Sequence, residues 1–269
     1  MKKLTAVALA LVMLVSVFAL TSCEKVTAYS LVTDAVAKTN ALDSFEADMN
    51  IAMGMSVMGV TMEVPMDYNI KAAGLKGENP VSFSTIDMSL MGATMTTESY
   101  MEGDWCYISV SGQNMKVKVG EDSEEYDGYA NIESAIKGLP EEVLSEVEIV
   151  ENEDGTKTVS VAIEDDKFAE IYKDFIDSMA ASATETNDSI SDISITNATV
   201  EITVDENGYV SVYKMAFDMN IDVETSGIVV GTEASVEMEI TFKNPGTAVT
   251  ITPPEGYQDF PEVDLDALM

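Results

Sequence analysis

The chain has 269 residues, a formal net charge of −34 and no histidine, and all of its basic residues are lysines. This charge repels phosphates and anionic headgroups, which excludes nucleic-acid binding as a function. The hydrophobic fraction of 46% is too high for a disordered acidic chain, so we expect a folded protein with a sizeable core.

The N-terminus has the parts of a bacterial secretion signal. Two lysines precede an apolar run over residues 4–20, and two small polar residues and a cysteine follow. The four residues that end the signal resemble the bacterial lipobox; they are Leu20, Thr21, Ser22 and Cys23. This resemblance implies that residues 1–22 are removed and that lipid is attached to Cys23.

Lipid on Cys23 holds a protein at the membrane without protein contacts, because two or more acyl chains anchor stably where one does not. An uncleaved membrane-spanning anchor is the alternative, but a span needs about 20 apolar residues and this run is slightly shorter. We therefore expect a lipid-anchored protein on the extracytoplasmic face of a bacterial cell membrane, with residues 23–25 as a lipidated tether.

The first half of the remaining chain reads as one helix followed by an antiparallel meander. Apolar residues share one helical face over 26–42. From Phe45 onward the apolar period changes to two, which predicts a pair of strands around Gly59. Further strands with turns between them are expected at Val81–Leu90, Thr94–Met101, Trp105–Val110 and Met115–Val119.

The middle of the chain is acidic and partly helical. A helical face is expected over 132–139, and Pro140 suits a first helical position. Asp154-Gly155 suits a type I′ hairpin turn. Asp165 or Asp166 caps the clearest helix of the chain, whose apolar stripe comprises Phe168, Ile171, Tyr172, Phe175, Ile176 and Met179.

Residues 181–192 read as a polar connector, and a clean strand pattern follows it. Apolar and polar residues alternate over 200–204, 213–223 and 236–242, as in an antiparallel sheet covered on one side only. Long strands of this kind must curl to bury their apolar face, and the amphipathic helices are the obvious lids. We therefore expect an α+β fold, in which amphipathic helices cover the concave face of a strongly bent antiparallel β-sheet, or half-barrel.

This arrangement resembles the LolA/LolB-like superfamily, which includes mycobacterial lipoproteins of the LppX and LprG type. The resemblance rests on the lipobox, the helix after it, the paired long strands and a closing strand at 249–252 that two prolines follow. It implies a single half-barrel domain over residues 26–260, followed by an acidic tail at 261–269, and a concave apolar face that holds acyl chains. LolA latches its lid with an arginine, and this chain has no arginine.

The residue types that most catalytic and cofactor sites need are missing. Without histidine there is no Ser-His-Asp or Cys-His arrangement, and without arginine there is no bidentate clamp for phosphate. Cys106 lies in a strand-like run and is expected to be a buried apolar residue rather than a nucleophile. The acidic turns at 151–155 and 205–208 lack the spacing of calcium loops. We expect no enzyme activity, no cofactor and no metal site, and weak binding of divalent cations through charge alone.

Methionines are concentrated in the first strands, since ten of the sixteen that follow Cys23 lie between Met49 and Met101. Packing or lipid contact is favoured over copper binding, because histidine, the usual partner ligand, is absent. A methionine-rich wall accommodates acyl chains of varied shape. The residues expected to line the groove are Met49, Met53, Met55, Met62, Met66, Phe217, Met219, Met238, Phe168 and Tyr172.

The sequence therefore predicts a monomeric, membrane-anchored lipoprotein that binds a lipid or other apolar ligand in a half-barrel groove and performs no covalent chemistry. The alternative is a cell-surface sensor or scaffold whose core is fully packed and whose acidic face meets a partner or cations. An open apolar cavity of about 300 to 1,000 Å³ favours ligand binding, whereas a filled concave face favours the alternative.

Overall fold

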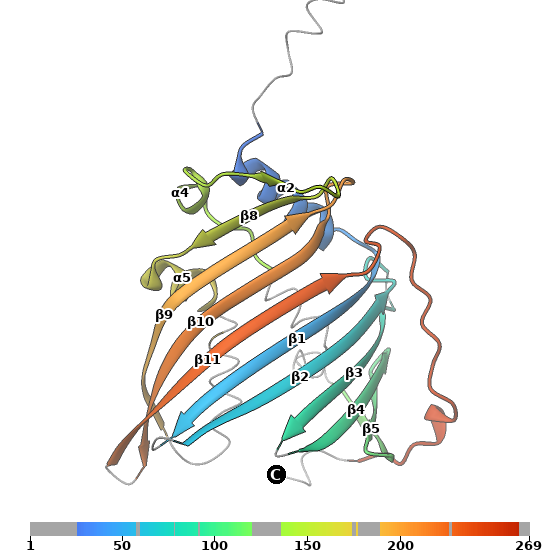
Figure 1. Cartoon of the computed structure of the whole chain (residues 1–269). Coiled ribbons are helices and arrows are strands. Elements are labelled where there is room, and N and C mark those ends of the chain that lie inside the picture. The colour runs from blue at the N-terminus through green and yellow to red at the C-terminus, as the bar shows by residue number, and fades with distance from the viewer. Residues whose placement is uncertain are drawn as a thin grey trace, which may run out of the picture.

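The described part of the chain forms an eleven-stranded antiparallel sheet with a few short helices (Figure 1). The computed structural model describes residues 26–57, 60–77, 79–90, 92–119, 136–173, 176, 189–225 and 228–263. The predicted signal, lipobox and tether lie outside these ranges. Among the helices within them, none is long and apolar enough to cross a membrane.

The elements alternate between groups of strands and short helices. In chain order they are α2 (Ala28–Asn40), β1 (Ser44–Val57), β2 (Val60–Ala73), β3 (Val81–Leu90), β4 (Ala93–Glu102), β5 (Trp105–Val110), β6 (Gln113–Lys118), α4 (Glu141–Leu144), β7 (Val150–Glu151), β8 (Lys157–Ala162), α5 (Asp165–Ile171), β9 (Ser189–Val204), β10 (Val210–Thr225), β11 (Ile228–Phe242) and the 3₁₀ turn η2 (Tyr257–Asp259).

The sheet consists of two meanders joined at its centre. Its strand order is β6-β5-β4-β3-β2-β1-β11-β10-β9-β8-β7. The first long strand, β1, pairs with the last, β11, so that Ala47 lies opposite Phe242 and Ser56 lies opposite Glu233. Because β6 and β7 stand at opposite ends of this order, the sheet is open. This half-barrel with few helices confirms the expected α+β fold class.

Alternation along the strands gives the sheet two different faces. The inner face is the one on which α2 and α5 pack, and it carries the main core, including Val32 of α2 and Phe168 of α5. At the end of α5 the buried hydroxyl of Tyr172 hydrogen-bonds to that of Tyr213 in β10, which in turn donates to the carbonyl of Lys137. These bonds tie α5 and the segment before α4 to the sheet.

The N-terminus of α2 is stabilised locally by a reciprocal cap. The Thr27 hydroxyl accepts a hydrogen bond from the Ser30 backbone at 3.1 Å, and the Ser30 hydroxyl accepts one from the Thr27 backbone at 3.1 Å. These two bonds satisfy amide groups that have no partner inside the helix. The helix therefore starts close to where the sequence pattern places it.

The segment after β11 runs along the outer face, opposite the helices, to the far edge of the sheet (Figure 1). The Val249 amide donates to the Ser44 hydroxyl at 3.1 Å. At the far edge, the Lys116 amide donates to the Pro261 carbonyl at 2.8 Å, and the Val263 amide donates to the Lys116 carbonyl at 2.9 Å. Residues 261–263 therefore cover part of the edge of β6.

Two predicted elements are wrong in their type. Residues 136–140 are not helical, and α4 begins only after Pro140. Ile136 and Leu139 are nevertheless buried, so an irregular segment delivers the same apolar side chains to the core. Residues 249–252 are not a strand, because this part of the chain crosses the sheet instead of joining it.

Two further predictions are wrong in detail. The Asp154-Gly155 turn is not type I′, since only Gly155 has a positive φ, and Asp154 instead accepts a hydrogen bond from the Thr156 amide. Residues 189–192 were expected in the polar connector but belong to β9, where the equally long β10 pairs with them. Pairing with a long neighbouring strand thus extends β9 beyond the residues that show apolar alternation.

Candidate functional site

The predicted groove residues fall into two groups according to burial. The first group is packed in the core of the inner face, with each side chain 3% exposed or less; it comprises Met49, Phe217, Met219, Met238, Phe168 and Tyr172. Phe168 also packs against Phe217 at 5.1 Å between ring centroids, which fills the space between α5 and β10. This part of the inner face is a packed core, the outcome that favours the alternative of a fully packed interaction module, so the ligand-binding prediction depends on the remaining groove residues.

The second group is half-buried and consists of Met53, Met62 and Met66. The side chain of Met55 lies outside the described part of β1. The predicted lipobox residues Leu20, Thr21, Ser22 and Cys23 also lie outside the described residues. Their roles stay predictions.

Met53 and its neighbours form a continuous apolar surface on the inner face of β1, β2 and β3. Directly opposite residues share a face, and Ile51 lies opposite Met66, which in turn lies opposite Met88. We call this surface the methionine stretch; its half-buried members are Ile51, Met53, Met62, Val64, Met66, Tyr68, Ile86 and Met88. It continues the core of the helix-covered half without being packed to the same degree.

The chemistry of the methionine stretch is that of an adaptable apolar surface. Methionine side chains are flexible and adapt to irregular apolar partners, and the branched side chains between them add more rigid contacts. The one hydroxyl in the stretch, that of Tyr68, donates to the Met66 sulfur at 3.7 Å. Burial raises the pKa of Tyr68, so the phenol is neutral at ordinary pH. The surface therefore suits an uncharged, flexible ligand chain.

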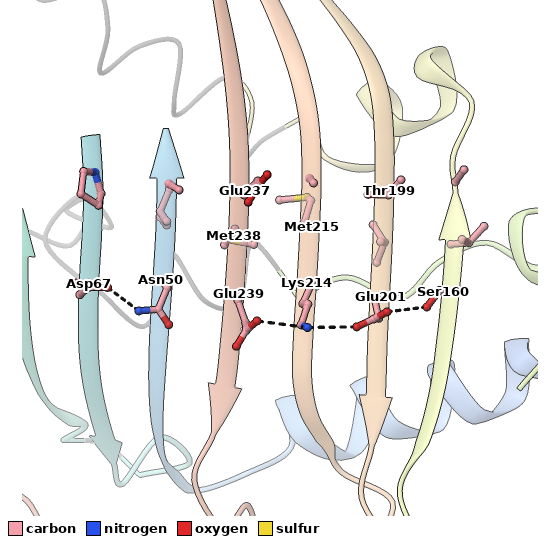
Figure 2. Close-up of a pocket in the computed structure, with 17 residues that line it drawn as sticks. Asn50, Asp67, Ser160, Thr199, Glu201, Lys214, Met215, Glu237, Met238 and Glu239 are labelled. Carbon is pink, nitrogen blue, oxygen red and sulfur yellow. Dashed lines mark hydrogen bonds and ion pairs between the residues drawn. The ribbon is translucent and has the colours of Figure 1, made fainter. Parts of the chain in front are cut away.

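The outer face carries a shallow trough of about 680 Å³ across β2, β1, β11, β10, β9 and β8 (Figure 2). Small side chains from a row across these strands line much of it, with Ala52 and Ala216 lying on either side of Glu237 in the register. Glu237 is exposed and has no hydrogen-bond or ion-pair partner within the part of the chain that the structure describes. The trough is therefore open and negatively charged.

A row of polar side chains runs beside the small residues (Figure 2). Lys214 lies between Glu201 and Glu239, with 3.4 Å from its Nζ to each carboxylate. The carboxylate of Glu239, against some desolvation, and that of Glu201 raise the pKa of Lys214. In the same row, Asn50 donates to Asp67 at 2.6 Å. Since the lysine is neutralised twice, the row offers no surplus positive charge.

The sequence pattern did not mark Lys214, Glu237 or Glu239 as site residues. Their alternation along β10 and β11 was visible in the sequence, but it showed only that they face away from the core. Which residues of different strands lie side by side depends on the register of strands far apart in the chain.

Two further features are the possible metal ligands and Cys106. In the described ranges, no group of three or more histidine, cysteine or acidic side chains is arranged to hold a metal ion. Cys106 is fully buried in a small cluster with Val117 and Val119, as expected for an apolar residue.

Comparison with known proteins relates most of the chain to one family. A family model described as a family of unknown function, DUF6612, matches residues 27–256. No curated protein matches the chain.

Among solved structures, LprF from Mycobacterium bovis matches with 16% identity and a TM-score of 0.46, over 85% of this chain and 97% of that one. A DUF1329 family protein from Desulfovibrio piger matches with 11% identity and a TM-score of 0.28, over 82% and 93%. A LolA superfamily protein from Nitrosomonas europaea matches with 12% identity and a TM-score of 0.25, over 81% and 94%. The superfamily named from the sequence is thus among the matches. The half-barrel fold itself is shown by the strand order of the open antiparallel sheet.

Proposed function

Because the chain belongs to DUF6612, a family of unknown function, we propose a function from its own geometry: it binds a lipid or other apolar ligand on the methionine stretch of the inner face. The protein is a monomeric lipoprotein, anchored through Cys23 at the extracytoplasmic face of a bacterial cell membrane, and it performs no covalent chemistry. The observation that carries the proposal is the continuous half-buried apolar surface next to a tightly packed core.

The distribution of burial supports this assignment. Met215 and Met238 of the helix-covered half are each 2% exposed, whereas Met53, Met62 and Met66 on the same face are only half-buried. Partly exposed apolar surface costs free energy in water, about 25 cal/mol per Å². A ligand chain that covers the stretch recovers that free energy, which provides the driving force for binding.

The lipid anchor supports the same function through position. The described body is acidic and is repelled by anionic headgroups, so attachment depends on acyl chains at Cys23. Residues between Cys23 and α2 are few, which keeps the half-barrel close to a source of lipid. Replacing Cys23 by serine should release the protein from the membrane fraction, as followed by cell fractionation.

Lipid binding is tested by native mass spectrometry of the purified protein and by titration with a dansyl-labelled fatty acid. We expect co-purified lipid and saturable fluorescence in the wild type. Met53→Glu places a carboxylate in the stretch and should weaken the fatty acid affinity about tenfold, since an unpaired charge is costly in apolar surroundings. Ala52→Glu introduces the same carboxylate one residue away on the outer face and should leave the affinity unchanged.

The proposal fails if the wild type carries no lipid and does not bind the fatty acid. It also fails if Met53→Glu and Ala52→Glu bind the probe equally well while both variants retain the wild-type melting temperature.

A second candidate function, an interaction module with a cationic partner, is favoured by the outer trough. Glu237 has no hydrogen-bond or ion-pair partner there among the described residues, and the neighbouring Lys214 is neutralised by two carboxylates. An oligolysine peptide should bind this face at low salt, with Glu237→Gln weaker than the matched variant Glu153→Gln in a distant turn. Equal loss in both variants would mean that only the net charge matters.

A further inference from the structure

A smaller cavity lies on the outer face at the far end of the sheet, between β4, β5 and the C-terminal segment. Its volume is about 210 Å³. The segment is fixed beside it by Tyr257, whose ring centroid lies 5.0 Å from that of Tyr100 and 4.8 Å from that of Tyr107. The Tyr257 hydroxyl also donates to the Glu102 carboxylate at 2.9 Å. We call this cavity the crevice.

Three aromatic rings line the crevice. Tyr100 and Tyr107 come from neighbouring strands, with ring centroids 5.9 Å apart, and Phe260 comes from the C-terminal segment. The rings of Tyr107 and Phe260 are inclined at 71° with centroids 6.3 Å apart. These two rings meet at an angle at the crevice, and the ring of Tyr100, which is 2% exposed, lines it as well.

The charges at the crevice are negative. Glu98 from β4 and Glu255 from the C-terminal segment line it, and neither carboxylate has a hydrogen-bond or ion-pair partner among the described residues. None of the residues found to line it is basic. Lys116 lies directly opposite Tyr107 in the register, and its Nζ is held by the Gln258 carbonyl, to which it donates at 3.2 Å, and lies 5.4 Å from the ring centre of Trp105.

Burial, and secondly the negative charge of Glu102, disfavour the phenolate of Tyr100 at the crevice. Together they raise the pKa of Tyr100 to about 12. The same field favours a cation near the rings.

We infer that the crevice binds a small organic cation of the quaternary ammonium class, with the rings of Tyr107 and Phe260 against its methyl groups and Glu98 and Glu255 as counter-charges. The site is separate from the apolar surface of the proposed function, since it lies on the opposite face of the sheet.

The size of the crevice and its aromatic lining favour this class of ligand. The crevice is smaller than the roughly 300 Å³ at which pockets for drug-sized ligands begin, so it suits a compact group. Aromatic faces attract cations through the ring quadrupole, and quaternary ammonium groups are the ligands for which enclosures of rings are best suited. A metal ion needs several oxygen ligands around it, and aromatic rings do not supply them.

Choline and its uncharged carbon isostere dimethylbutanol, which have the same shape, separate charge recognition from apolar contact. Each is titrated into the purified full-length protein and followed by saturation-transfer NMR of its methyl protons. We expect choline to bind about tenfold more tightly than the isostere, the effect of a desolvated cation on aromatic rings.

Two variants locate the binding. Phe260→Leu keeps an apolar side chain but removes one ring, and it should weaken choline binding about fivefold with little effect on the isostere. Glu255→Gln should weaken choline binding as well, and the matched control Glu153→Gln, which removes the same charge from a distant turn, should not. The exposed glutamine variants are not expected to unfold, which keeps the test valid if Phe260→Leu loses stability.

Vesicles of phosphatidylcholine distinguish a lipid headgroup from free choline as the source of the cation. Co-sedimentation that Phe260→Leu reduces assigns a headgroup, whereas binding of choline without co-sedimentation assigns a soluble ligand. Absence of choline binding, equal affinity for choline and the isostere, or equal loss in Glu255→Gln and Glu153→Gln overturns the inference.

Discussion

The inner face is covered by helices in one half of the sheet and only partly covered in the other. In the helix-covered half, α2 and α5 pack on β9 and β10, and Met215 is 2% exposed. In the other half, Met66 on β2 occupies the equivalent face of an equally regular strand but is half-buried. The comparison teaches that alternation determines which face a methionine occupies, while the layer above the face determines whether the methionine is buried core or partly exposed surface.

The largest effect that separates the two halves is expected from truncating a methionine in each. Met215→Ala should lower the free energy of unfolding by about 2 to 5 kcal/mol, because it leaves a cavity in packed surroundings. Met66→Ala should cost about 1 kcal/mol or less, since its side chain is partly hydrated already. Urea unfolding followed by circular dichroism measures both values.

Adding a saturating fatty acid sharpens this comparison. The ligand should stabilise the wild type and do so less in Met66→Ala, whereas Met215→Ala should keep the full ligand-dependent gain. Equal losses of stability in the two variants without ligand would show that the halves are packed alike.

A second effect is expected at high pH. Burial raises the pKa of Tyr213 to about 12, and burial also raises the pKa of Tyr172 well above its ordinary value near 10. A raised tyrosine pKa stabilises the fold fully below the unfolded pKa near 10, and this stabilisation is lost as the pH rises toward 12. For Tyr213 the loss amounts to about 2 to 3 kcal/mol.

Unfolding free energies measured at pH 9 and above should therefore fall less steeply in Tyr213→Phe than in the wild type. Tyr68→Phe is the comparison in the half-covered part, and because Tyr68 is only half-buried its removal should change the pH dependence less than Tyr213→Phe does. A wild type whose stability does not change over this range would contradict the burial of the pair.

The smallest effect is expected on the outer face. Lys214 is about half exposed, and surface ion pairs contribute about 0.2 to 1 kcal/mol. Lys214→Gln leaves Glu201 and Glu239 without their shared cation and should cost about 0.5 to 1 kcal/mol at low salt. Lys157→Gln, which removes the partner of a single exposed carboxylate, should cost less. Thermal melts at low and high salt measure the difference, which salt should reduce.

Strand positions could be predicted from the sequence because each strand carries its own alternation. The predicted strand over Val81–Leu90 and that over Trp105–Val110 agree with the structure at both ends. The irregular segment around Ile136 could not be predicted, since its apolar spacing resembles that of a helix and tertiary packing decides its conformation.

The candidate sites were less predictable, because their residues come from segments that are far apart along the chain. Met66 was identified because a methionine on an apolar face is visible locally, but its half-burial depends on which elements lie above it. Glu237 beside Ala52, and Phe260 beside Tyr107, are neighbours only after strands or segments far apart have met. No local pattern contains that information.

The pairing of β1 with β11 has a consequence for how the chain reaches this fold. The centre of the sheet joins Ala47 to Phe242, so the first strand acquires its second neighbour only when nearly the whole chain is available. Pairings between such distant segments slow folding, because a large loop must close before its contacts form. A nascent chain that ends at β10 leaves the edge of β1 without its native partner, and this edge is then open to pairing with other chains. Pairing of β11 with β1 is therefore the step that joins the two meanders into one sheet.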